Sequence, residues 1–448
     1  MNQLTRRELL AASATVMASC KRSPIVAAAS GDPVRFGLIG TGSRGTFLLK
    51  RLLNVESARC AALCDIYRPN LDKAKEFAPG GPELYSDYRS LLDDPKVEAV
   101  VVATPLFRHF EITRAALDAG KHVFCEKCLV FKPEEIQALR AACAAHPKLV
   151  LQTGLQRRYS PFYKAAKQMI DNGLLGEVTH IRAQWHRNSS WRNPLPDPKL
   201  ERQINWRLYR EFSGGLTSEL ASHQIDVADW MFGSKPEFVT GVGGLDFYQD
   251  GRDIYDNIQL IFQYPKGRKL LYSAISTNSF LPIFNGTRPQ FGEEIMGTGG
   301  TIHITIGDAA NPAVGPAFAM WYVEQNAPKV QKGAPAKENA TAGPTIPTGK
   351  LGAGLPVLLP SDDIAKSDSF LQREYKYSRR WLYKQGIAMP EEERNPVEIS
   401  LDDFFGCIRT GRRPVADLEV GLQDSLSVMM ANRAMDEGRR VRAEEFDA

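Results

Sequence analysis

An alternation of short apolar runs with helical patterns between residues 34 and 153 constrains the fold more than any other feature of this sequence. Strands are predicted at 34–39, 58–63, 97–103, 122–125 and 149–151, and helices at 45–54, 70–77, 110–119 and 133–145. Apolar strands joined by helices imply right-handed crossovers and a parallel sheet that is buried on both faces. The sequence therefore predicts a doubly wound parallel α/β domain over residues 34–155.

The pattern changes after Gly176. Longer segments of alternating apolar and polar residues predict strands at 178–186, 237–247, 257–264, 269–277 and 294–306. Such alternation is typical of an antiparallel sheet with one face open to solvent or to a partner. Helical patterns cover 401–409 and 418–437, and residues 327–360, which lack an apolar period, are expected to form a long surface loop. Residues 156–448 are thus expected to form a C-terminal α/β domain with a large, mainly antiparallel open sheet.

The first 29 residues resemble an export signal of the twin-arginine type, because Arg6 and Arg7 precede a short apolar stretch. Two processing sites compete. Residues 27–29 have the small-residue form expected before a cleaved bond, whereas the stretch that ends at Cys20 resembles a lipoprotein signal. We therefore expect an exported, periplasmic protein, with a lipid anchor on Cys20 as the alternative to a free mature chain.

Charge and cysteine content exclude several classes of protein. The chain has 56 Lys and Arg against 52 Asp and Glu and no basic block, so nucleic acid is not an expected partner. No apolar run reaches the ~20 residues of a bilayer span, so a membrane contact is expected only through Cys20. Cys125 and Cys128 have metal-ligand spacing, but no second pair lies at zinc-ribbon distance, and we expect buried thiols and no metal site.

A glycine-rich turn follows the first predicted strand and opens the first predicted helix. It consists of Gly40, Thr41, Gly42, Ser43, Arg44 and Gly45. In this context Gly40 makes the tight turn, Gly42 lets the backbone approach a pyrophosphate, and Gly45 packs the helix on the strand. The N-terminus of the helix supplies N–H donors and a positive dipole. These residues predict a dinucleotide-binding site of the Rossmann type.

Asp65 ends the second predicted strand, where it can accept a hydrogen bond from an adenosine ribose hydroxyl. Its charge would repel a 2′-phosphate, so NAD is favoured over NADP, although the nearby Arg68 leaves NADP as an alternative. Thr104, Pro105 and His109 follow the strand over 97–103, at the edge of the sheet where ligands bind. We expect these residues to contact the cofactor.

Glu126 and Lys127 follow the strand over 122–125. A lysine at this place can donate to a hydroxyl that loses a hydride, and partial desolvation can lower its pKa enough for proton transfer. The alternative is a surface lysine with an acidic partner. We expect Glu126 and Lys127 to lie beside the cofactor and Lys127 to be catalytic.

Glycines at 214 and 215 precede a helical pattern that carries Glu219, His223 and Asp226 at positions i, i+4 and i+7. An α-helix places these three side chains on one face. A carboxylate one turn from a histidine can fix its tautomer and raise its basicity, as a general base needs. We expect His223 and Glu219 to be catalytic and Asp226 to lie beside the substrate; the alternative is a structural histidine.

Aromatic and guanidinium groups gather ahead of this helix and predict a carbohydrate-binding wall, because indole faces stack on sugar C–H surfaces while Arg donates to hydroxyls or carboxylates. The alternative for each tryptophan is a place in the core. The candidate substrate-binding residues of the wall are Arg157, Trp185, His186, Arg187 and Trp206.

Together these motifs resemble the glucose–fructose oxidoreductase / inositol dehydrogenase (Gfo/Idh/MocA) family over residues 34 to about 310 and again over about 400–436. The resemblance implies a Rossmann domain that binds NAD(P), and an open sheet that often forms an oligomer interface. It also implies that Lys127 and His223 act on a sugar or polyol hydroxyl while hydride passes to the nicotinamide. Two residues depart from the family pattern, since Cys128 replaces a proline and Glu219 replaces an aspartate.

Export adds a constraint, because no diffusible NAD pool is expected outside the cytoplasm. A tightly bound cofactor that is regenerated in each turnover would satisfy it. One hypothesis is an oxidoreductase acting on a secondary hydroxyl of a sugar, polyol or glycoside. The second is a redox-neutral glycosidase or epimerase that uses transient oxidation and elimination, and the third is a non-catalytic sugar-binding lipoprotein.

Overall fold

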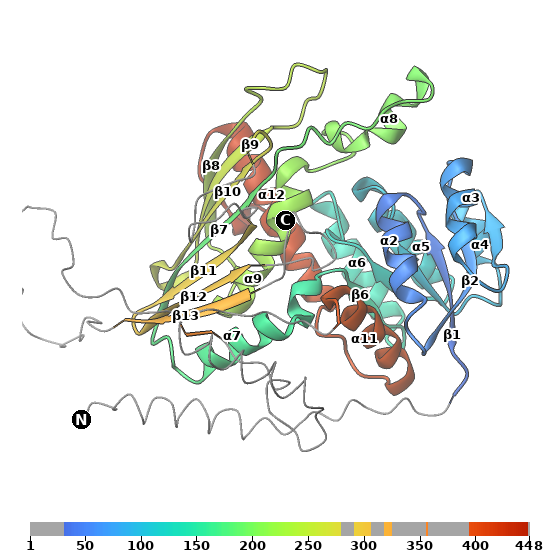
Figure 1. The fold of residues 1–448 in the computed structure, drawn as a ribbon, viewed down its shortest axis with the longest axis horizontal. Helices are drawn as coiled ribbons and strands as arrows, with labels where there is room; N and C mark the ends of the chain where they lie inside the picture. Colours follow the sequence, from blue (N-terminus) through green and yellow to red (C-terminus); the bar gives the residue numbers. More distant parts are fainter. Residues whose placement is uncertain (1–30, 279–290, 306–317, 325–354, 357–393, 447–448) are drawn as a thin grey trace, which may run out of the picture.

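The computed structural model of the chain describes residues 31–278, 291–305, 318–324, 355–356 and 394–446. The predicted export signal over 1–29, with Cys20, lies outside the described residues, as does most of the predicted loop over 327–360. The described residues form two sheets with helices between and around them (Figure 1).

The N-terminal sheet has six strands in the order β3-β2-β1-β4-β5-β6, and every pair in it is parallel. Its strands are β1 (Val34–Ile39), β2 (Ala58–Cys64), β3 (Glu83–Tyr85), β4 (Ala99–Val102), β5 (His122–Cys125) and β6 (Leu151–Thr153). Its helices are α2 (Ser43–Leu52), α3 (Arg68–Phe77), α4 (Tyr88–Leu92), α5 (His109–Asp118) and α6 (Glu134–Ala145). The predicted doubly wound domain is confirmed.

Burial explains why these strands could be recognised in the sequence. All four residues of β4 are fully buried, because helices cover both faces of the sheet. The short elements β3 and α4 were not predicted, since three and five residues are too few to show a period.

The second sheet has nine strands in the order β14-β13-β12-β11-β7-β10-β9-β8-β15. They are β7 (Val178–His186), β8 (Phe238–Gly244), β9 (Asn257–Gln263), β10 (Lys269–Ile275), β11 (Phe291–Gly297), β12 (Gly300–Thr305), β13 (Phe318–Val323), β14 (Leu355–Pro356) and β15 (Val441–Arg442). Among these strands β7 and β10 pair in parallel and the other pairs are antiparallel, which confirms the mainly antiparallel sheet.

Two predictions about this sheet need correction. The strand predicted over 294–306 is a hairpin of β11 and β12 that turns at Thr298 and Gly299, because the small residues there permit a reversal. Within the loop predicted over 327–360, the two residues of β14 pair with β13.

Four helices accompany the second sheet. They are α7 (Pro161–Asp171), α8 (Glu201–Ile204), α9 (Ser222–Phe232) and α12 (Leu418–Glu437), and α9 and α12 lie between the large sheet and the Rossmann domain (Figure 1). On α12 the Ser425 hydroxyl oxygen accepts hydrogen bonds from the backbone N–H groups of Leu129 (3.0 Å) and Val130 (3.4 Å). This contact fixes the chain that follows Lys127.

Helix α11 (Pro396–Thr410) does not belong to the C-terminal domain, to which the sequence analysis assigned it. It packs on the N-terminal sheet, where the rings of Phe405 and Phe36 and those of Phe404 and Phe124 are each 5.9 Å apart. Both phenylalanines of α11 are fully buried. The sequence could not show that the chain comes back to the N-terminal sheet at α11. Periodicity indicates that a helix has an apolar face but not which sheet covers that face.

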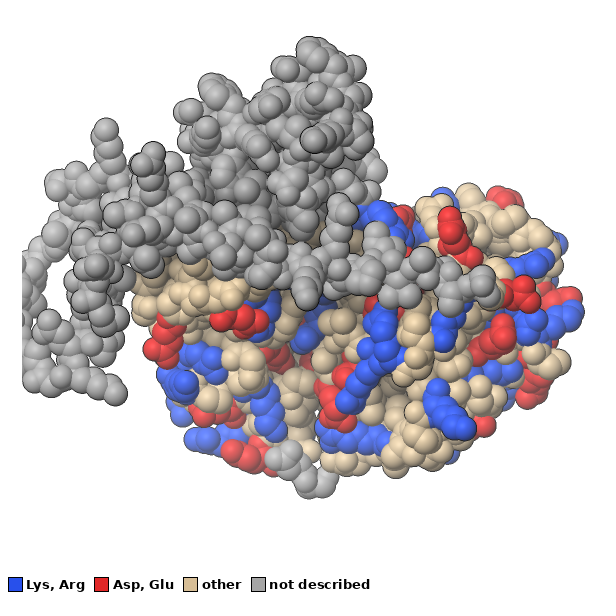
Figure 2. Space-filling model, turned by 90° about the horizontal axis from the view of Figure 1, so that it is seen from below, with Lys and Arg blue, Asp and Glu red and all other residues tan. Residues whose placement is uncertain are grey.

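The described surface carries interspersed charges. On the face shown in Figure 2, Lys and Arg side chains alternate with Asp and Glu side chains over the part that is not grey. None of the described helices combines the length and the apolar character needed to cross a bilayer. The described cysteines are free thiols, and Cys64, Cys125, Cys128 and Cys407 are buried.

Candidate active site

The glycine-rich turn joins β1 to α2 and lies against the end of β4. Gly40 has φ +90°, and a Cβ there would lie 2.7 Å from the Ala103 carbonyl oxygen. A Cβ on Gly45 would lie 1.8 Å from the carbonyl oxygen of Gly40. The helix therefore packs so closely on the turn that only glycine fits at position 45. The roles predicted for these two residues agree with this geometry.

The space in front of this turn fits a dinucleotide. A Cβ on Gly42 would meet only the Asn70 side-chain nitrogen, at 3.6 Å, so the backbone is open to a ligand at this point. Helix α2 begins at Ser43, and no side chain caps its N-terminus. Its first backbone N–H groups and positive dipole are therefore available to a pyrophosphate.

Asp65, at the end of β2, is tied to the glycine-rich turn. Its carboxylate accepts hydrogen bonds from the backbone N–H of Thr41 (2.7 Å), the Thr41 hydroxyl (3.1 Å) and the backbone N–H of Tyr67 (2.8 Å). The Asn70 side-chain amide donates to the same carboxylate at 3.5 Å, which is the longest of these contacts and the one that a ribose hydroxyl could replace. Arg68, which could favour a 2′-phosphate, forms an ion pair with Asp72 at 2.9 Å.

The turn after β4 lies against the glycine-rich turn, since a Cβ on Gly40 would lie 2.9 Å from the Thr104 backbone nitrogen. The Thr104 hydroxyl is buried and has no hydrogen-bond partner in the described part of the chain. His109 was predicted to contact the cofactor, but its ring lies behind the turn. Its Nδ1 lies 2.7 Å from the Cys128 carbonyl oxygen and its Nε2 lies 2.9 Å from the Thr104 carbonyl oxygen. His109 therefore holds the two turns of the site together and has no free ring nitrogen for a ligand.

Glu126 connects the glycine-rich turn to the catalytic candidate Lys127. The Arg44 guanidinium forms an ion pair with the Glu126 carboxylate at 2.7 Å. The Lys127 ammonium donates hydrogen bonds to the carbonyl oxygens of Ser218 (2.7 Å) and Glu219 (3.1 Å). The peptide bond between Lys127 and Cys128 is cis. Lys127, predicted from the end of β5, thus lies against the segment that carries His223.

A π-helical turn, Thr217–Ala221, leads into α9 and positions His223. His223 is 6% exposed, and its ring lies 5.7 Å from the ring of Trp185 on β7. Its Nδ1 is buried and has no hydrogen-bond partner among the described residues. Burial, together with the charges of Lys127 and Arg157, holds the pKa of His223 well below its usual value, so the imidazole is neutral at pH 7.

Glu219 does not orient His223, contrary to the prediction. Its carboxylate accepts a hydrogen bond from Arg207 Nε at 2.8 Å. The π-helical turn supplies the physical reason, because its wider spacing breaks the i, i+4 alignment that an α-helix would give. Burial would raise the pKa of Glu219, but Arg207 and Lys127 hold it below its usual value.

Asp226 is also engaged elsewhere. Its carboxylate accepts a hydrogen bond from Arg158 Nε at 2.8 Å, and it is 2% exposed. The structure therefore does not present Asp226 to a substrate. The sequence showed both Arg158 and Asp226, but their pairing joins the segment after β6 to α9 and could not be read from spacing.

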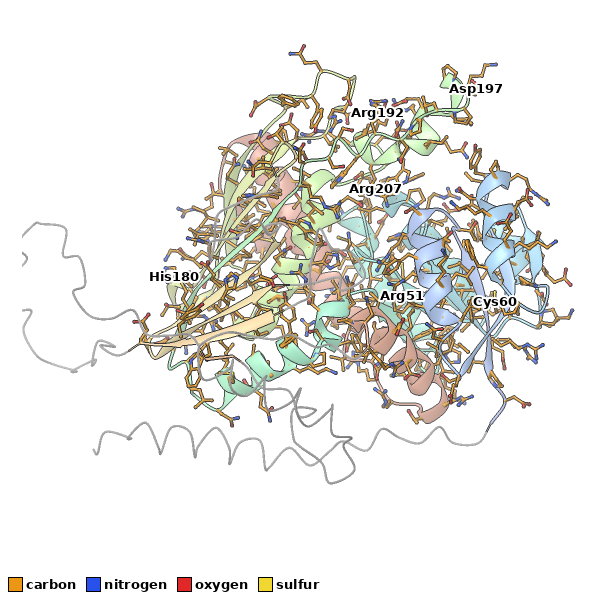
Figure 3. The ribbon with its side chains drawn as sticks, in the orientation of Figure 1. Arg51, Cys60, His180, Arg192, Asp197 and Arg207 are labelled. Atoms are coloured by element: carbon orange, nitrogen blue, oxygen red, sulfur yellow. The ribbon has the colours of Figure 1, made fainter. Side chains whose placement is uncertain are left out.

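The predicted carbohydrate wall is largely brought together on the inner face of the large sheet. The Arg157 guanidinium lies 5.4 Å from the Trp185 ring and that of Arg187 lies 5.3 Å from it, while Arg157 is paired with the buried Glu293. The Arg207 guanidinium, which lies on the segment between the large sheet and the Rossmann domain (Figure 3), is 4.2 Å from the Trp206 ring.

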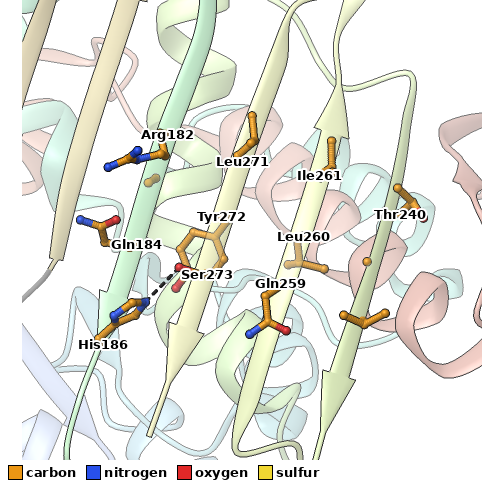
Figure 4. Close-up of a pocket in the computed structure, with 13 residues that line it drawn as sticks. Arg182, Gln184, His186, Thr240, Gln259, Leu260, Ile261, Leu271, Tyr272 and Ser273 are labelled. Carbon is orange, nitrogen blue, oxygen red and sulfur yellow. Dashed lines mark hydrogen bonds between the residues drawn. The ribbon is translucent and has the colours of Figure 1, made fainter. Parts of the chain in front are cut away.

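His186 lies on the opposite face of the sheet and does not reach this site. Its Nε2 is 2.9 Å from the Ser273 hydroxyl, in a hollow on the outer face that Gln184 and Gln259 also line (Figure 4). Neighbouring residues of a strand point to opposite faces, so Trp185 and His186 could not both have faced the substrate.

Several residues of the site were not predicted. Arg207 neutralises Glu219, Glu293 neutralises Arg157, and the Tyr272 hydroxyl on β10 is buried without a partner in the described part of the chain. Arg207 lies in an aromatic and basic segment of the sequence that could have identified it. Glu293 and Tyr272 carry no local signal, because only the sheet pairing brings their strands to the site.

The fold and the site define a two-domain protein with a Rossmann domain whose glycine-rich turn is open to a dinucleotide. The sequence matches the oxidoreductase family with an NAD-binding Rossmann fold over residues 34–154 and the GFO/IDH/MocA C-terminal domain over residues 163–303. The chain therefore belongs to the GFO/IDH/MocA family.

Relatives in the family share part of their length with this chain. YrbE of Bacillus subtilis, described as an uncharacterized oxidoreductase, is 30% identical over 201 residues, which are 44% of this chain and 54% of YrbE. Myo-inositol 2-dehydrogenase of Thermotoga maritima is 30% identical over 212 residues, which are 47% of this chain and 59% of that enzyme. The chain thus spans less than two thirds of the length of these relatives.

Solved structures share the fold over nearly the whole chain. The aldose-aldose oxidoreductase of Caulobacter crescentus, complexed with glycerol, matches with a TM-score of 0.64 at 21% identity, over 92% of this chain and 99% of that one. Levoglucosan dehydrogenase in complex with NADH matches with a TM-score of 0.66 at 20% identity, also over 92% and 99%.

Proposed function

We propose that this protein is an NAD-dependent oxidoreductase that acts on a secondary hydroxyl of a sugar, polyol or glycoside. The observation that carries the proposal is the contact of the Lys127 ammonium with the carbonyl oxygens of Ser218 and Glu219, one turn before His223. This contact joins the end of the dinucleotide-binding sheet to the neutral imidazole. The names of relatives, which include inositol 2-dehydrogenases, support the substrate class.

Lys127 is suited to polarise the reacting hydroxyl. An ammonium has three N–H donors, and the two carbonyl oxygens of the π-helical turn take two of them. The third is available to a substrate oxygen, whose developing negative charge it stabilises. NAD, held by the glycine-rich turn and Asp65, would supply the hydride acceptor when bound.

His223 is suited to take the proton of that hydroxyl. Burial and the charges of Lys127 and Arg157 keep the imidazole neutral, as a general base must be before it acts. The same cations disfavour the imidazolium, so the proton is readily passed on. Trp185, packed against the His223 ring, fixes its orientation.

NAD is proposed over NADP because the Asp65 carboxylate lies against the glycine-rich turn, where its charge would repel a 2′-phosphate, and because the cation of Arg68 is paired with Asp72. The arginine pair at the N-terminus supports export by the twin-arginine route, with the cofactor bound tightly before export and regenerated in turnover. A lipid anchor on Cys20 is the alternative to a free periplasmic protein.

We propose that the outer face of the large sheet pairs with a second copy of the chain. Val242, Ile261 and Leu271 are 66%, 43% and 38% exposed there, around the hollow of Figure 4. Exposed apolar side chains grouped on one sheet face favour association. The Ile261→Asp variant should lower the molar mass measured by light scattering, whereas an unchanged mass would contradict this interface.

The test of the activity follows absorbance at 340 nm when candidate sugars and polyols are added to the purified full chain with NAD. Reduced nicotinamide is expected to form, and Lys127→Met is expected to lower kcat by about 10²–10⁴-fold while NADH still binds. Lys121→Met, at the other end of β5, where the ammonium donates to the carbonyl oxygens of Asp94 and Val97, serves as the control. Turnover by Lys127→Met at the native rate would refute the role of Lys127.

A further inference from the structure

The cations of the site differ in how their charge is balanced. Arg44 pairs with Glu126, Arg157 with Glu293 and Arg207 with Glu219. Arg187, in contrast, forms no ion pair with any described carboxylate. The site therefore contains a guanidinium that no carboxylate of the described residues contacts, although the charge of Glu219 acts on it from a greater distance.

Arg187 is held in place by aromatic rings. It directly follows β7, where its backbone N–H donates to the Ile275 carbonyl oxygen at 2.7 Å. Its guanidinium carbon lies 5.3 Å from the Trp185 ring and 5.9 Å from the Trp191 ring. Contacts with ring faces use the flat surface of the guanidinium and leave its N–H edge free for a planar acceptor.

Trp191 provides a second donor at this place. Its indole N–H is buried and has no hydrogen-bond partner among the described residues. Its φ is +60°, a conformation that is uncommon outside glycine, costs free energy and is enriched at functional sites. A buried N–H without a partner costs free energy as well, and an acceptor on a ligand removes that cost.

The same site is joined to the catalytic residues. Trp185 contacts both the His223 ring and the Arg187 guanidinium. A ligand whose hydroxyl lies between Lys127 and His223 can therefore place another group near Arg187. Arg187 is itself exposed, so its guanidinium is accessible to a ligand.

We propose that the substrate is a sugar acid, whose carboxylate is bound by the guanidinium of Arg187 and the indole N–H of Trp191. This inference rests on the proposed function and names its substrate class. A carboxylate matches the available donors, since it is planar, carries one charge and accepts two parallel hydrogen bonds from a guanidinium. A sugar phosphate would bring a tetrahedral group of higher charge to a site with one guanidinium that no described carboxylate contacts.

The experiment compares matched ligands that differ at one carbon. The full chain, loaded with NAD, is titrated by calorimetry with glucuronate and glucose, with galacturonate and galactose, and with glucose 6-phosphate. Initial rates of NADH formation are measured in parallel. One charge-assisted contact predicts that each uronate binds about 10- to 100-fold more tightly than its hexose.

Variants test whether Arg187 causes this preference. Arg187→Met should bring the ratio of uronate to hexose affinity to about one, and Trp191→Phe should lower it several-fold. Arg114→Met, at an exposed ion pair on α5, is the matched control and should keep the native ratio. Equal affinity for uronate and hexose, a preference for glucose 6-phosphate, or an unchanged ratio in Arg187→Met would each overturn the proposal.

The two readouts separate this inference from the proposed function. If NADH forms from hexoses and uronates are not preferred, the proposal of a sugar-acid substrate is contradicted and the proposed oxidoreductase activity is supported. Uronate binding that depends on Arg187, with no NADH formed from any ligand, contradicts the oxidoreductase and supports the carboxylate site.

Discussion

The two hydrogen bonds of His109 make the stability of the Rossmann domain depend on pH. Both ring nitrogens face carbonyl oxygens, at 2.7 and 2.9 Å, and an imidazole can donate to both only when it carries two protons. Burial opposes that charge, but the Cys125 side chain and the two carbonyl groups outweigh it and raise the pKa of His109 from 6.5 to about 9.

The size of the effect follows from linkage. Because the folded pKa lies above the unfolded one, the stabilisation is fully present below pH 6.5 and is lost as the pH rises through about 9. With a folded pKa about 2.5 above the unfolded one, the charged ring contributes ~3 kcal/mol to the free energy of unfolding at low pH. About 2.5 kcal/mol of this contribution is lost between pH 7 and pH 10. For a domain of this size we expect the melting temperature to fall by roughly 5–10 °C.

Other groups also titrate in this range, so the measurement is a difference between proteins. Thermal unfolding of the native chain and of His109→Gln is recorded from pH 6 to pH 10. The variant, which cannot carry the charge, should be less stable at pH 7, and its melting temperature should change less between pH 7 and pH 10. Histidine labelled with ¹⁵N should show both nitrogens of His109 protonated at pH 7. Parallel melting curves, or a singly protonated ring at pH 7, would refute this reasoning.

Three further substitutions test the cofactor site and the packing of α11 on the N-terminal sheet. Gly45→Ala would place a Cβ 1.8 Å from the Gly40 carbonyl oxygen and should abolish NADH binding in a fluorescence titration. In the control Gly406→Ala the new Cβ meets only the Arg412 side chain, at 3.5 Å, and the Kd for NADH should not change. Equal Kd values for the two variants would contradict the role of the turn. Asp65→Ala should reduce the preference for NAD over NADP and weaken both, because Thr41 loses its acceptor, and an unaltered preference would remove Asp65 from cofactor selection. Phe404→Ala should destabilise the Rossmann domain by about 3–5 kcal/mol in chemical denaturation, and a cost below ~1 kcal/mol would show that α11 is not part of this core.

The features that sequence reasoning found are those fixed by local pattern. The apolar strands β1, β4 and β5 are buried on both faces. Glycines are needed in the first turn because its backbone groups lie so close together that they leave no room for a Cβ. Lys127 was found because residues at the carboxyl ends of parallel strands meet at one edge of the sheet.

The features that it missed depend on contacts between distant segments. Glu219 was assigned to His223 on α-helical spacing, but a π-helical turn directs it to Arg207. His186 was placed with Trp185, although a strand directs neighbours to opposite faces. The pairing of Asp226 with Arg158 joins separate elements and left no periodic trace in the sequence.

The central claim is that Lys127 and His223 act on one hydroxyl beside the glycine-rich turn. A crystal structure of the full chain with NAD and a bound polyol or sugar acid tests it most directly. We expect one ligand oxygen within hydrogen-bond distance, about 2.6–3.2 Å, of both the Lys127 ammonium and a ring nitrogen of His223. A ligand that contacts only one of these side chains, with the other facing a separate region, would contradict the account.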